Sequence, residues 1–186
     1  MIIRKMELPS VATQGGSTSG TSVNNLVFIG DSRTVGMQSA VGGNDTWSGK
    51  VSAGLDWMQS SGVPNVEGSI KNGSAVIILM GVNDLYRADS YISYINGKAS
   101  SWASKGAHTY FVSVNPTEGS YNHLNSDIDS FNQKLKSGLS NVSYIDTNSY
   151  LKSNGFSTTD GLHYTSDTYN TVSYTHLRAH ETLMNL

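Results

Sequence analysis

The segment Asn25–Gln38, "NLVFIGDSRTVGMQ", decides the prediction of the fold. It opens with an unbroken apolar run, LVFI, of the kind found in strands that are buried on both faces. The run stops at Gly30, Asp31 and Ser32, and the residues after them can start a helix. A buried strand is therefore predicted to deliver a small residue, a carboxylate and a hydroxyl to its carboxyl end.

The rest of the chain repeats this alternation of strand and helix. Apolar runs predict strands at Leu26–Ile29, Lys50–Ala53, Ala75–Met80, Thr109–Val114 and Ser143–Ile145. Between them, apolar residues at helical spacing predict two long helices, which end at Gly106 and Gly138. The alternation predicts an α/β fold with a mostly parallel five-stranded sheet and helices on both faces.

Chemistry-bearing residues follow the predicted strands at their carboxyl ends, where open α/β sheets bind ligands. We interpret Ser32 as a nucleophile, His163 as the base that removes its proton, and Asp160 as the group that orients the imidazole. The backbone amides of Ser32 and Gly54 and the side-chain amide of Asn83 are the candidate donors of an oxyanion hole.

Each of these residues also has an ordinary structural interpretation. Gly, Asp and Ser are common turn residues, Asn83 and Asp84 can cap a helix, and Asp160 can form a turn. A single histidine such as His163 is more often hydrogen-bonded in a loop than catalytic. The occurrence of four suitable loops, each after a strand, favours catalysis.

Four short blocks resemble the SGNH hydrolases, also called GDSL-type esterases. They are "GDS" with Ser32, "AG" with Gly54, "GVND" with Asn83, and "DGLH" with Asp160 and His163. The resemblance spans residues 24–170 and implies a three-layer α/β/α fold of flavodoxin-like type. It also implies ester hydrolysis through an acyl-serine intermediate, with those residues as triad and oxyanion hole and with no metal or other cofactor.

The segments "GKVSAGLDW" and "YFVSVNP" further resemble bacterial domains that act on O-acetyl groups of cell-wall glycans or polysaccharides. We therefore expect a small acyl ester of a carbohydrate as substrate. Four aromatic residues can stack on sugar rings or belong to the core: Trp47, Trp57, Tyr86 and Tyr121. The alternatives are an O-acetyltransferase with the same triad and a catalytically silent glycan-binding module.

Arg33 stands directly after the predicted nucleophile, where the family's alternative name has leucine. If its side chain faces the cleft, it can bind an acidic group of the substrate; if it points away, which we favour, it is a solvated cation. Asn115, after the fourth strand, is a second candidate for substrate binding. Asp31 and Asp84 are interpreted as structural residues.

The composition narrows the class of protein. The 186 residues have near-average composition for one globular domain, and a formal charge of −2 with scattered basic residues does not favour nucleic acid as a partner. The chain has no cysteine, which excludes disulfides and thiolate catalysis. No apolar window is long enough for a membrane span. Oligomeric state is left open.

The two ends of the chain differ from the predicted domain at 24–171. Residues 1–23 are rich in Gly, Ser and Thr and are predicted to be a flexible linker in a longer secreted protein of the bacterial envelope or exterior. Residues 172–186 resemble translated sequencing-adapter DNA from metagenomes and are predicted to be foreign to the domain. His176, His180 and Glu181 lie there, but their order is not that of a metalloprotease helix, so no metal site is predicted.

Overall fold

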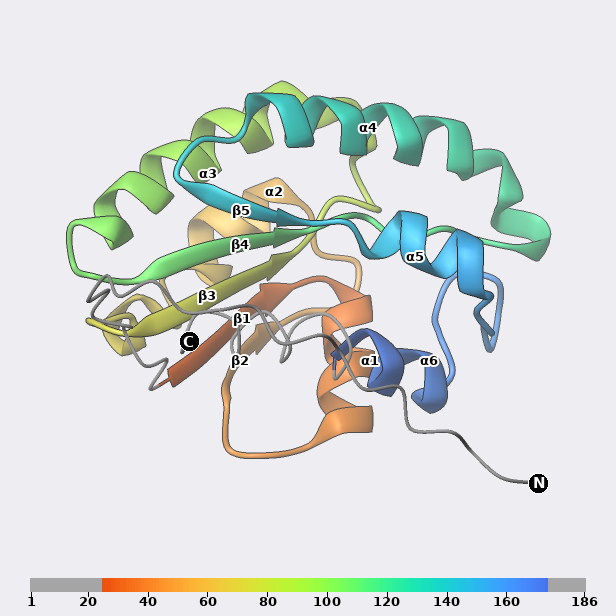
Figure 1. The fold of residues 1–186 in the computed structure, drawn as a ribbon, viewed down its shortest axis with the longest axis horizontal. Helices are drawn as coiled ribbons and strands as arrows, with labels where there is room; N and C mark the ends of the chain where they lie inside the picture. The colour runs from red at the N-terminus through yellow and green to blue at the C-terminus, as the bar shows by residue number, and fades with distance from the viewer. Residues whose placement is uncertain (1–24, 174–186) are drawn as a thin grey trace, which may run out of the picture.

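The structure is a computed structural model that describes residues 25–173. Its centre is a five-stranded parallel sheet in the order β2-β1-β3-β4-β5 (Figure 1). The strands are β1 (Asn25–Gly30), β2 (Thr46–Gly49), β3 (Ser74–Leu79), β4 (His108–Val112) and β5 (Val142–Ile145). The predicted parallel α/β architecture is confirmed. The predicted linker lies outside the described residues, as does the chain after residue 173.

Helices cover both faces of this sheet and make three layers (Figure 1). The main helices are α1 (Ser32–Val41), α2 (Leu55–Trp57), α3 (Ala88–Ala103), α4 (Asn125–Gly138), α5 (Thr147–Asn154) and α6 (Ser166–Val172). Short turns of other helix types are η1 (Met58–Gly62), η2 (Glu67–Ser69), η3 (Leu85–Arg87) and η4 (Gly119–Leu124). Helix α4 ends at Gly138 as predicted, whereas α3 ends at Ala103, before Gly106.

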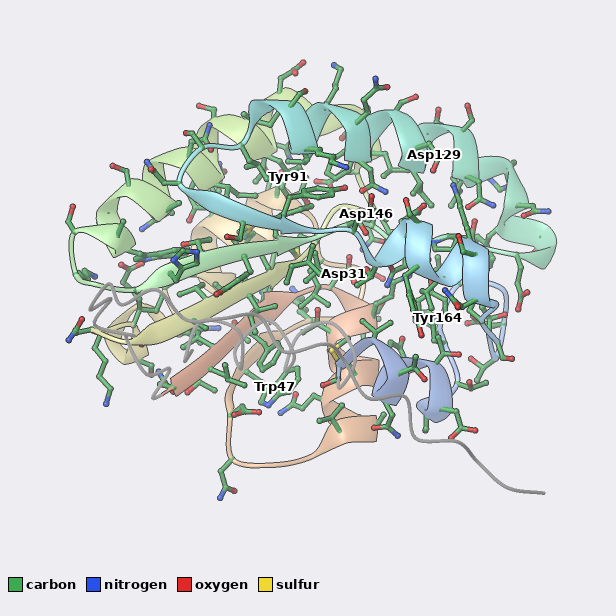
Figure 2. All side chains as sticks on the ribbon, in the orientation of Figure 1. Asp31, Trp47, Tyr91, Asp129, Asp146 and Tyr164 are labelled. Carbon is green, nitrogen blue, oxygen red and sulfur yellow. The ribbon has the colours of Figure 1, made fainter. Side chains whose placement is uncertain are left out.

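Side chains of β1 alternate between two apolar clusters, one on each face of the sheet. Val27 and Ile29 join the cluster under α2, α3 and α4, while Leu26 and Phe28 join the cluster under α1, α5 and α6. Figure 2 shows Tyr91 in the first layer and Trp47 on the opposite side. Burial on both faces explains why the strand reads as a continuous apolar run in the sequence.

The second strand lies earlier in the chain than predicted, at Thr46–Gly49 and not at Lys50–Ala53. Residues 50–53 are not a strand, because the chain turns there and Ser52 has a positive φ of 57°. The strand is β2, at the edge of the sheet, where the Trp47 ring stacks on Phe28 with centroids 3.9 Å apart. An edge strand has one partner strand and needs no continuous apolar run, so its sequence signal is weak.

Candidate active site

The three residues of the predicted triad come together at the carboxyl end of the sheet. Ser32 is the first residue of α1, directly beyond β1, and His163 lies in the loop between α5 and α6. The distance from Ser32 Oγ to His163 Nε2 is 2.9 Å, and that from His163 Nδ1 to Asp160 Oδ2 is 2.7 Å. Both are hydrogen-bond distances, so hydroxyl, imidazole and carboxylate form one continuous chain.

The tight turn between β1 and α1 positions the serine. An added Cβ at Gly30 would lie 1.7 Å from Thr34 Oγ1 and 2.5 Å from Leu79 O, so only glycine fits there. The Asp31 carboxylate then accepts a hydrogen bond from Arg33 N at 3.0 Å and caps α1. Ser32 therefore sits at the positive end of the helix dipole, which favours negative charge on its oxygen.

Asp160 is held ionised by its own loop. Its Oδ1 accepts hydrogen bonds from His163 N at 2.7 Å and from Leu162 N at 2.9 Å, while Oδ2 faces the imidazole. The backbone hydrogen bond from His163, followed by the bond from its side chain, lowers the pKa of Asp160 to about 2. A carboxylate with that pKa keeps its charge at any working pH and can stabilise an imidazolium beside it.

The candidate oxyanion donors come from the loops on either side of the serine. Because β1 lies between β2 and β3, Gly54 (after β2) and Asn83 (after β3) flank the start of α1. The Asn83 amide donates one hydrogen bond to Ala53 O at 2.8 Å, which joins the two loops. An amide nitrogen carries two protons, so one remains for a substrate.

Asp84 fixes the conformation of the glycine loop, a role that the sequence interpretation did not specify. Its Oδ2 accepts a hydrogen bond from Leu55 N at 2.8 Å, and its Oδ1 accepts one from the Tyr91 hydroxyl at 2.7 Å. An added Cβ at Gly54 would lie 2.6 Å from Asp84 Oδ2, so this loop requires glycine. The only sequence signal for this role is that Asp84 directly follows Asn83.

If Asn83 is an oxyanion donor, replacing it with alanine should reduce kcat by about a hundredfold to a thousandfold and change KM little. The reason is that the lost hydrogen bond stabilises charge that develops only in the transition state. Steady-state kinetics with p-nitrophenyl acetate measure both constants. A rise in KM with unchanged kcat would instead show that Asn83 binds the substrate in the ground state.

Arg33 corrects a prediction. It is not a solvated cation, because the residue is only 7% exposed. Its Nε donates a hydrogen bond to Leu162 O at 3.0 Å, and its Nη1 donates one to Asn115 O at 2.8 Å. The alternative interpretation, in which Arg33 binds an acidic group of the substrate, gains no support from this inward orientation.

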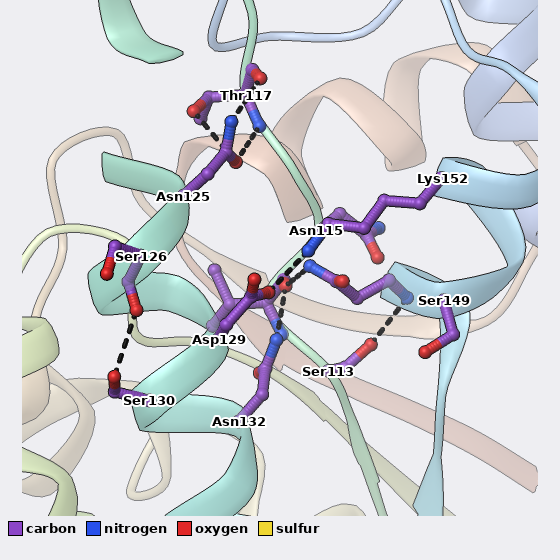
Figure 3. Close-up of polar contacts among 12 residues, drawn as sticks. Ser113, Asn115, Thr117, Asn125, Ser126, Asp129, Ser130, Asn132, Ser149 and Lys152 are labelled. Atoms are coloured by element: carbon purple, nitrogen blue, oxygen red, sulfur yellow. Dashed lines mark hydrogen bonds and ion pairs between the residues drawn. The ribbon is translucent and has the colours of Figure 1, made fainter. Parts of the chain in front are cut away.

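Asn115 also points into the protein. It is 8% exposed, and its Oδ1 accepts a hydrogen bond from Thr147 Oγ1 at 2.6 Å. Figure 3 shows Asn115 among the polar contacts at the end of β4, where Asn132 and Ser113 bind the backbone of neighbouring segments. This geometry favours a structural role for Asn115 and does not support the predicted substrate contact.

Burial raises the pKa of Asp31 from 3.8 to about 6. In the folded protein this carboxyl therefore binds a proton more readily than in the unfolded chain. Ionised Asp31 destabilises the fold above pH 6, and the penalty disappears as the pH falls below 4.

Replacing Asp31 with asparagine should therefore stabilise the protein at pH 7.5, by up to about 3 kcal/mol, and have little effect at pH 4. The asparagine Oδ1 can still accept the hydrogen bond from Arg33 N, so the helix cap is kept. Thermal denaturation of both proteins at the two pH values measures the difference. An equal shift in Tm at both values would contradict the assignment of a raised pKa.

Two surface hollows lie at the candidate site. One, of about 400 Å³, is lined by Ser32 and His163 together with residues of α1 and α6. The other, of about 450 Å³, is lined by Asn83, Tyr86 and residues of η4 and α4. The candidate nucleophile therefore borders one hollow, and the candidate oxyanion donor Asn83 borders the other.

The four aromatic residues considered for sugar stacking are placed differently. Tyr86 is 88% exposed and lines the hollow beside Asn83. Trp47 stacks on Phe28, and Trp57 packs against the core. Tyr121 is half-buried. Tyr86 is therefore the best placed of the four to meet a ligand.

Within residues 25–173 the structure contains no group of three or more side chains able to hold a metal ion. The paired histidines of the C-terminal segment lie outside the described residues. In the same described part, no helix is long and apolar enough to cross a bilayer. Val172 and Ser173, the first residues of the predicted foreign tail, are buried at the end of α6.

Comparison with known proteins finds similarity at the level of fold. No protein-family model and no curated protein matches the chain. Among solved structures, the chain is similar to a member of the lipolytic G-D-S-L family from Veillonella parvula, with a TM-score of 0.62 and 16% identity over 87% of this chain and 99% of that one.

Two further similar structures have names that specify acetyl chemistry. An acetylxylan esterase from Geobacillus stearothermophilus matches with a TM-score of 0.61 and 16% identity over 89% of this chain and 97% of that one. The C-terminal catalytic domain of a peptidoglycan O-acetyltransferase from Streptococcus pneumoniae matches with a TM-score of 0.56 and 18% identity over 86% and 96%. This chain therefore has the fold of these proteins.

Proposed function

We propose that this chain is a serine ester hydrolase of the SGNH type that removes short acyl groups through an acyl-serine intermediate. The observation that carries the proposal is the hydrogen-bonded chain from Ser32 through His163 to Asp160. This hydrogen-bonded chain lies beside two loops with amide groups suited to an oxyanion. The proposal is also supported by the fold that this chain shares with G-D-S-L lipolytic and acetylxylan esterase structures.

The first half of the reaction forms the acyl-enzyme. Ser32 Oγ attacks the ester carbonyl carbon while His163 Nε2 takes the hydroxyl proton, and Asp160 stabilises the resulting imidazolium. The carbonyl oxygen becomes an oxyanion and accepts hydrogen bonds from the amides of Ser32, Gly54 and Asn83. His163 then gives the proton to the departing alcohol oxygen, the carbon–oxygen bond of the ester breaks, and the acyl group remains on Ser32.

The second half regenerates the enzyme with water. His163 removes a proton from a water molecule, whose oxygen attacks the acyl carbon. The oxyanion again accepts the same hydrogen bonds. His163 returns the proton to Ser32 Oγ as the acyl–serine bond breaks, so carboxylic acid leaves and the triad is restored.

We propose an O-acetyl group on a carbohydrate as the substrate class. Tyr86 offers an exposed aromatic face beside Asn83, and the side chains of Asp127, Ser130 and Lys134 line the same hollow with groups suited to sugar hydroxyls. The similar acetylxylan esterase and peptidoglycan O-acetyltransferase structures support acetyl chemistry. Such a substrate fits a protein of the bacterial envelope or exterior, which we propose as its location.

Acetyl transfer to a sugar hydroxyl is the second candidate function, and the similarity to the O-acetyltransferase domain favours it. The two reactions share the acyl-serine and differ in whether water or an alcohol accepts the acetyl group. The same named residues serve both.

The test measures acetate released from p-nitrophenyl acetate, acetylated xylan and O-acetylated peptidoglycan, with and without an added sugar acceptor. Acetate release that is independent of the acceptor supports hydrolysis. Acetylated acceptor formed at the expense of acetate indicates transfer. Glycan binding without turnover of any of these esters would reject both and identify a silent binding module.

A further inference from the structure

We propose that Arg33 is a positioning residue that holds the His163 loop so that the imidazole stays within hydrogen-bonding distance of Ser32. The inference rests on the proposed function, because it concerns the distance between Ser32 and His163. The nucleophile and the base are 131 residues apart in the chain, and their hydrogen bond needs both segments to be placed accurately.

One guanidinium group connects three segments at this point. Arg33 is the second residue of α1, next to the nucleophile. Its Nε donates to the carbonyl of Leu162, the residue directly before His163, at 3.0 Å. Its Nη1 donates to the carbonyl of Asn115, beyond β4, at 2.8 Å. The group thus joins the nucleophile helix, the histidine loop and the end of a central strand.

The residue on the other side of His163 also contacts Arg33. The guanidinium carbon lies 5.1 Å from the centroid of the Tyr164 ring, which is within cation–π distance. The Tyr164 hydroxyl in turn donates a hydrogen bond to Pro116 O. Arg33 therefore contacts both chain neighbours of His163, which couples the position of the arginine to that of the imidazole.

The histidine loop has other contacts besides those with Arg33: an antiparallel bridge joins Thr158 and Tyr164, and Leu162 packs against the core. Asp160 is exposed and lies in the turn that this bridge closes. Glu118 supplies a second clamp, since its carboxylate accepts hydrogen bonds from Thr158 and its amide donates to Gly161 O at 2.9 Å. That clamp holds the loop before His163, whereas Arg33 holds the residues that flank it.

The buried charge of Arg33 is only partly compensated by its hydrogen bonds. Burying a charge opposes folding unless its donors are fully paired. Its Nη2 is buried with no hydrogen-bond partner among residues 25–173, and the two bonded acceptors are neutral carbonyls. Removing the side chain leaves both carbonyls without a donor, which costs stability, and it also releases the residues on either side of His163, which should change the geometry of the base.

The test compares Arg33→Met and Arg33→Lys with the unsubstituted chain in p-nitrophenyl acetate hydrolysis. Methionine keeps an apolar stem and removes every donor, so we expect kcat to fall by about a hundredfold with KM within about threefold. Lysine cannot bridge two carbonyls with a fork of donors, so it should restore only part of the loss. Labelling of Ser32 by a fluorophosphonate should slow in parallel, because it uses the same base.

A matched control changes a polar network at the other end of the sheet. Glu67 accepts hydrogen bonds from Trp102 and Lys105, both at 3.0 Å, remote from the triad. Replacing it with glutamine weakens that network, and we expect kcat to stay at the value of the unsubstituted chain. The control separates loss of stability from loss of alignment.

Three outcomes would overturn the inference. A rise in KM with unchanged kcat would make Arg33 a substrate-binding residue, and full kcat in Arg33→Lys would show that no bridging guanidinium is needed. If Arg33→Met fails to fold, the lysine variant alone decides by the same criterion. Absence of turnover that depends on Ser32 in the unsubstituted chain would overturn the proposed function, and this inference with it.

Discussion

Replacing Ser32 with alanine should reduce kcat for p-nitrophenyl acetate by at least about a thousandfold. The change removes the oxygen that forms the acyl-enzyme and leaves His163 without the donor that lies 2.9 Å from Nε2. Groups of a triad act as a unit, so the remaining residues cannot recover the lost rate. Steady-state kinetics and labelling by a fluorophosphonate both report the loss.

A suitable control is Ser104→Ala. Ser104 follows α3, and its hydroxyl donates a hydrogen bond to Ser100 O at 3.1 Å, far from the triad in the chain and at the other end of the sheet. We expect this variant to keep full activity. Equal activity of Ser32→Ala and the unsubstituted chain would reject Ser32 as the nucleophile and, with it, the proposed mechanism.

Replacing Asp160 with asparagine should lower kcat on the order of a thousandfold, the second-largest effect that we expect. Oδ1 of Asp160 accepts two backbone hydrogen bonds, from Leu162 and His163, and Oδ2 accepts the imidazole Nδ1–H. In asparagine a single oxygen must serve the two backbone amides, which places the NH₂ group against Nδ1. Nδ1 then becomes the acceptor and Nε2 carries the proton, so the imidazole cannot accept the Ser32 proton.

The control for this variant is Asp129→Asn, which removes the charge of an exposed carboxylate that pairs with Lys152. It should leave kcat unchanged. The pH profile gives a second criterion: because the pKa of Asp160 is about 2, the unsubstituted enzyme should show no loss of activity from protonation of this group above pH 4. Full activity in Asp160→Asn would show that His163 needs no carboxylate to orient it.

The order of strands and helices and the candidate triad could be predicted from the sequence. The apolar patterns identify strands and helices locally, and a general rule of parallel sheets says where the strand ends meet. Strand β1 is buried on both faces and so appears as an apolar run, and the amphipathic helices α3 and α4 show helical spacing. Parallel strands place their carboxyl ends at one edge of the sheet. Residues that follow the first, second, third and fifth strands therefore meet there, however far apart they are in the chain.

Contacts between distant segments account for the features that local sequence patterns do not specify. The edge strand at Thr46–Gly49 lacks an apolar run, because its position depends on pairing with β1. Asp84 bonds to a residue 29 positions earlier, and Arg33 bonds to carbonyls 82 and 129 positions later. A charged side chain in a sequence gives no sign of whether backbone carbonyls will surround it. The order of strands and loops in the sequence is enough to predict which chemical groups reach the candidate site. Which of them face a substrate, and which hold the others in place, depends on the packing of segments that are far apart in the chain.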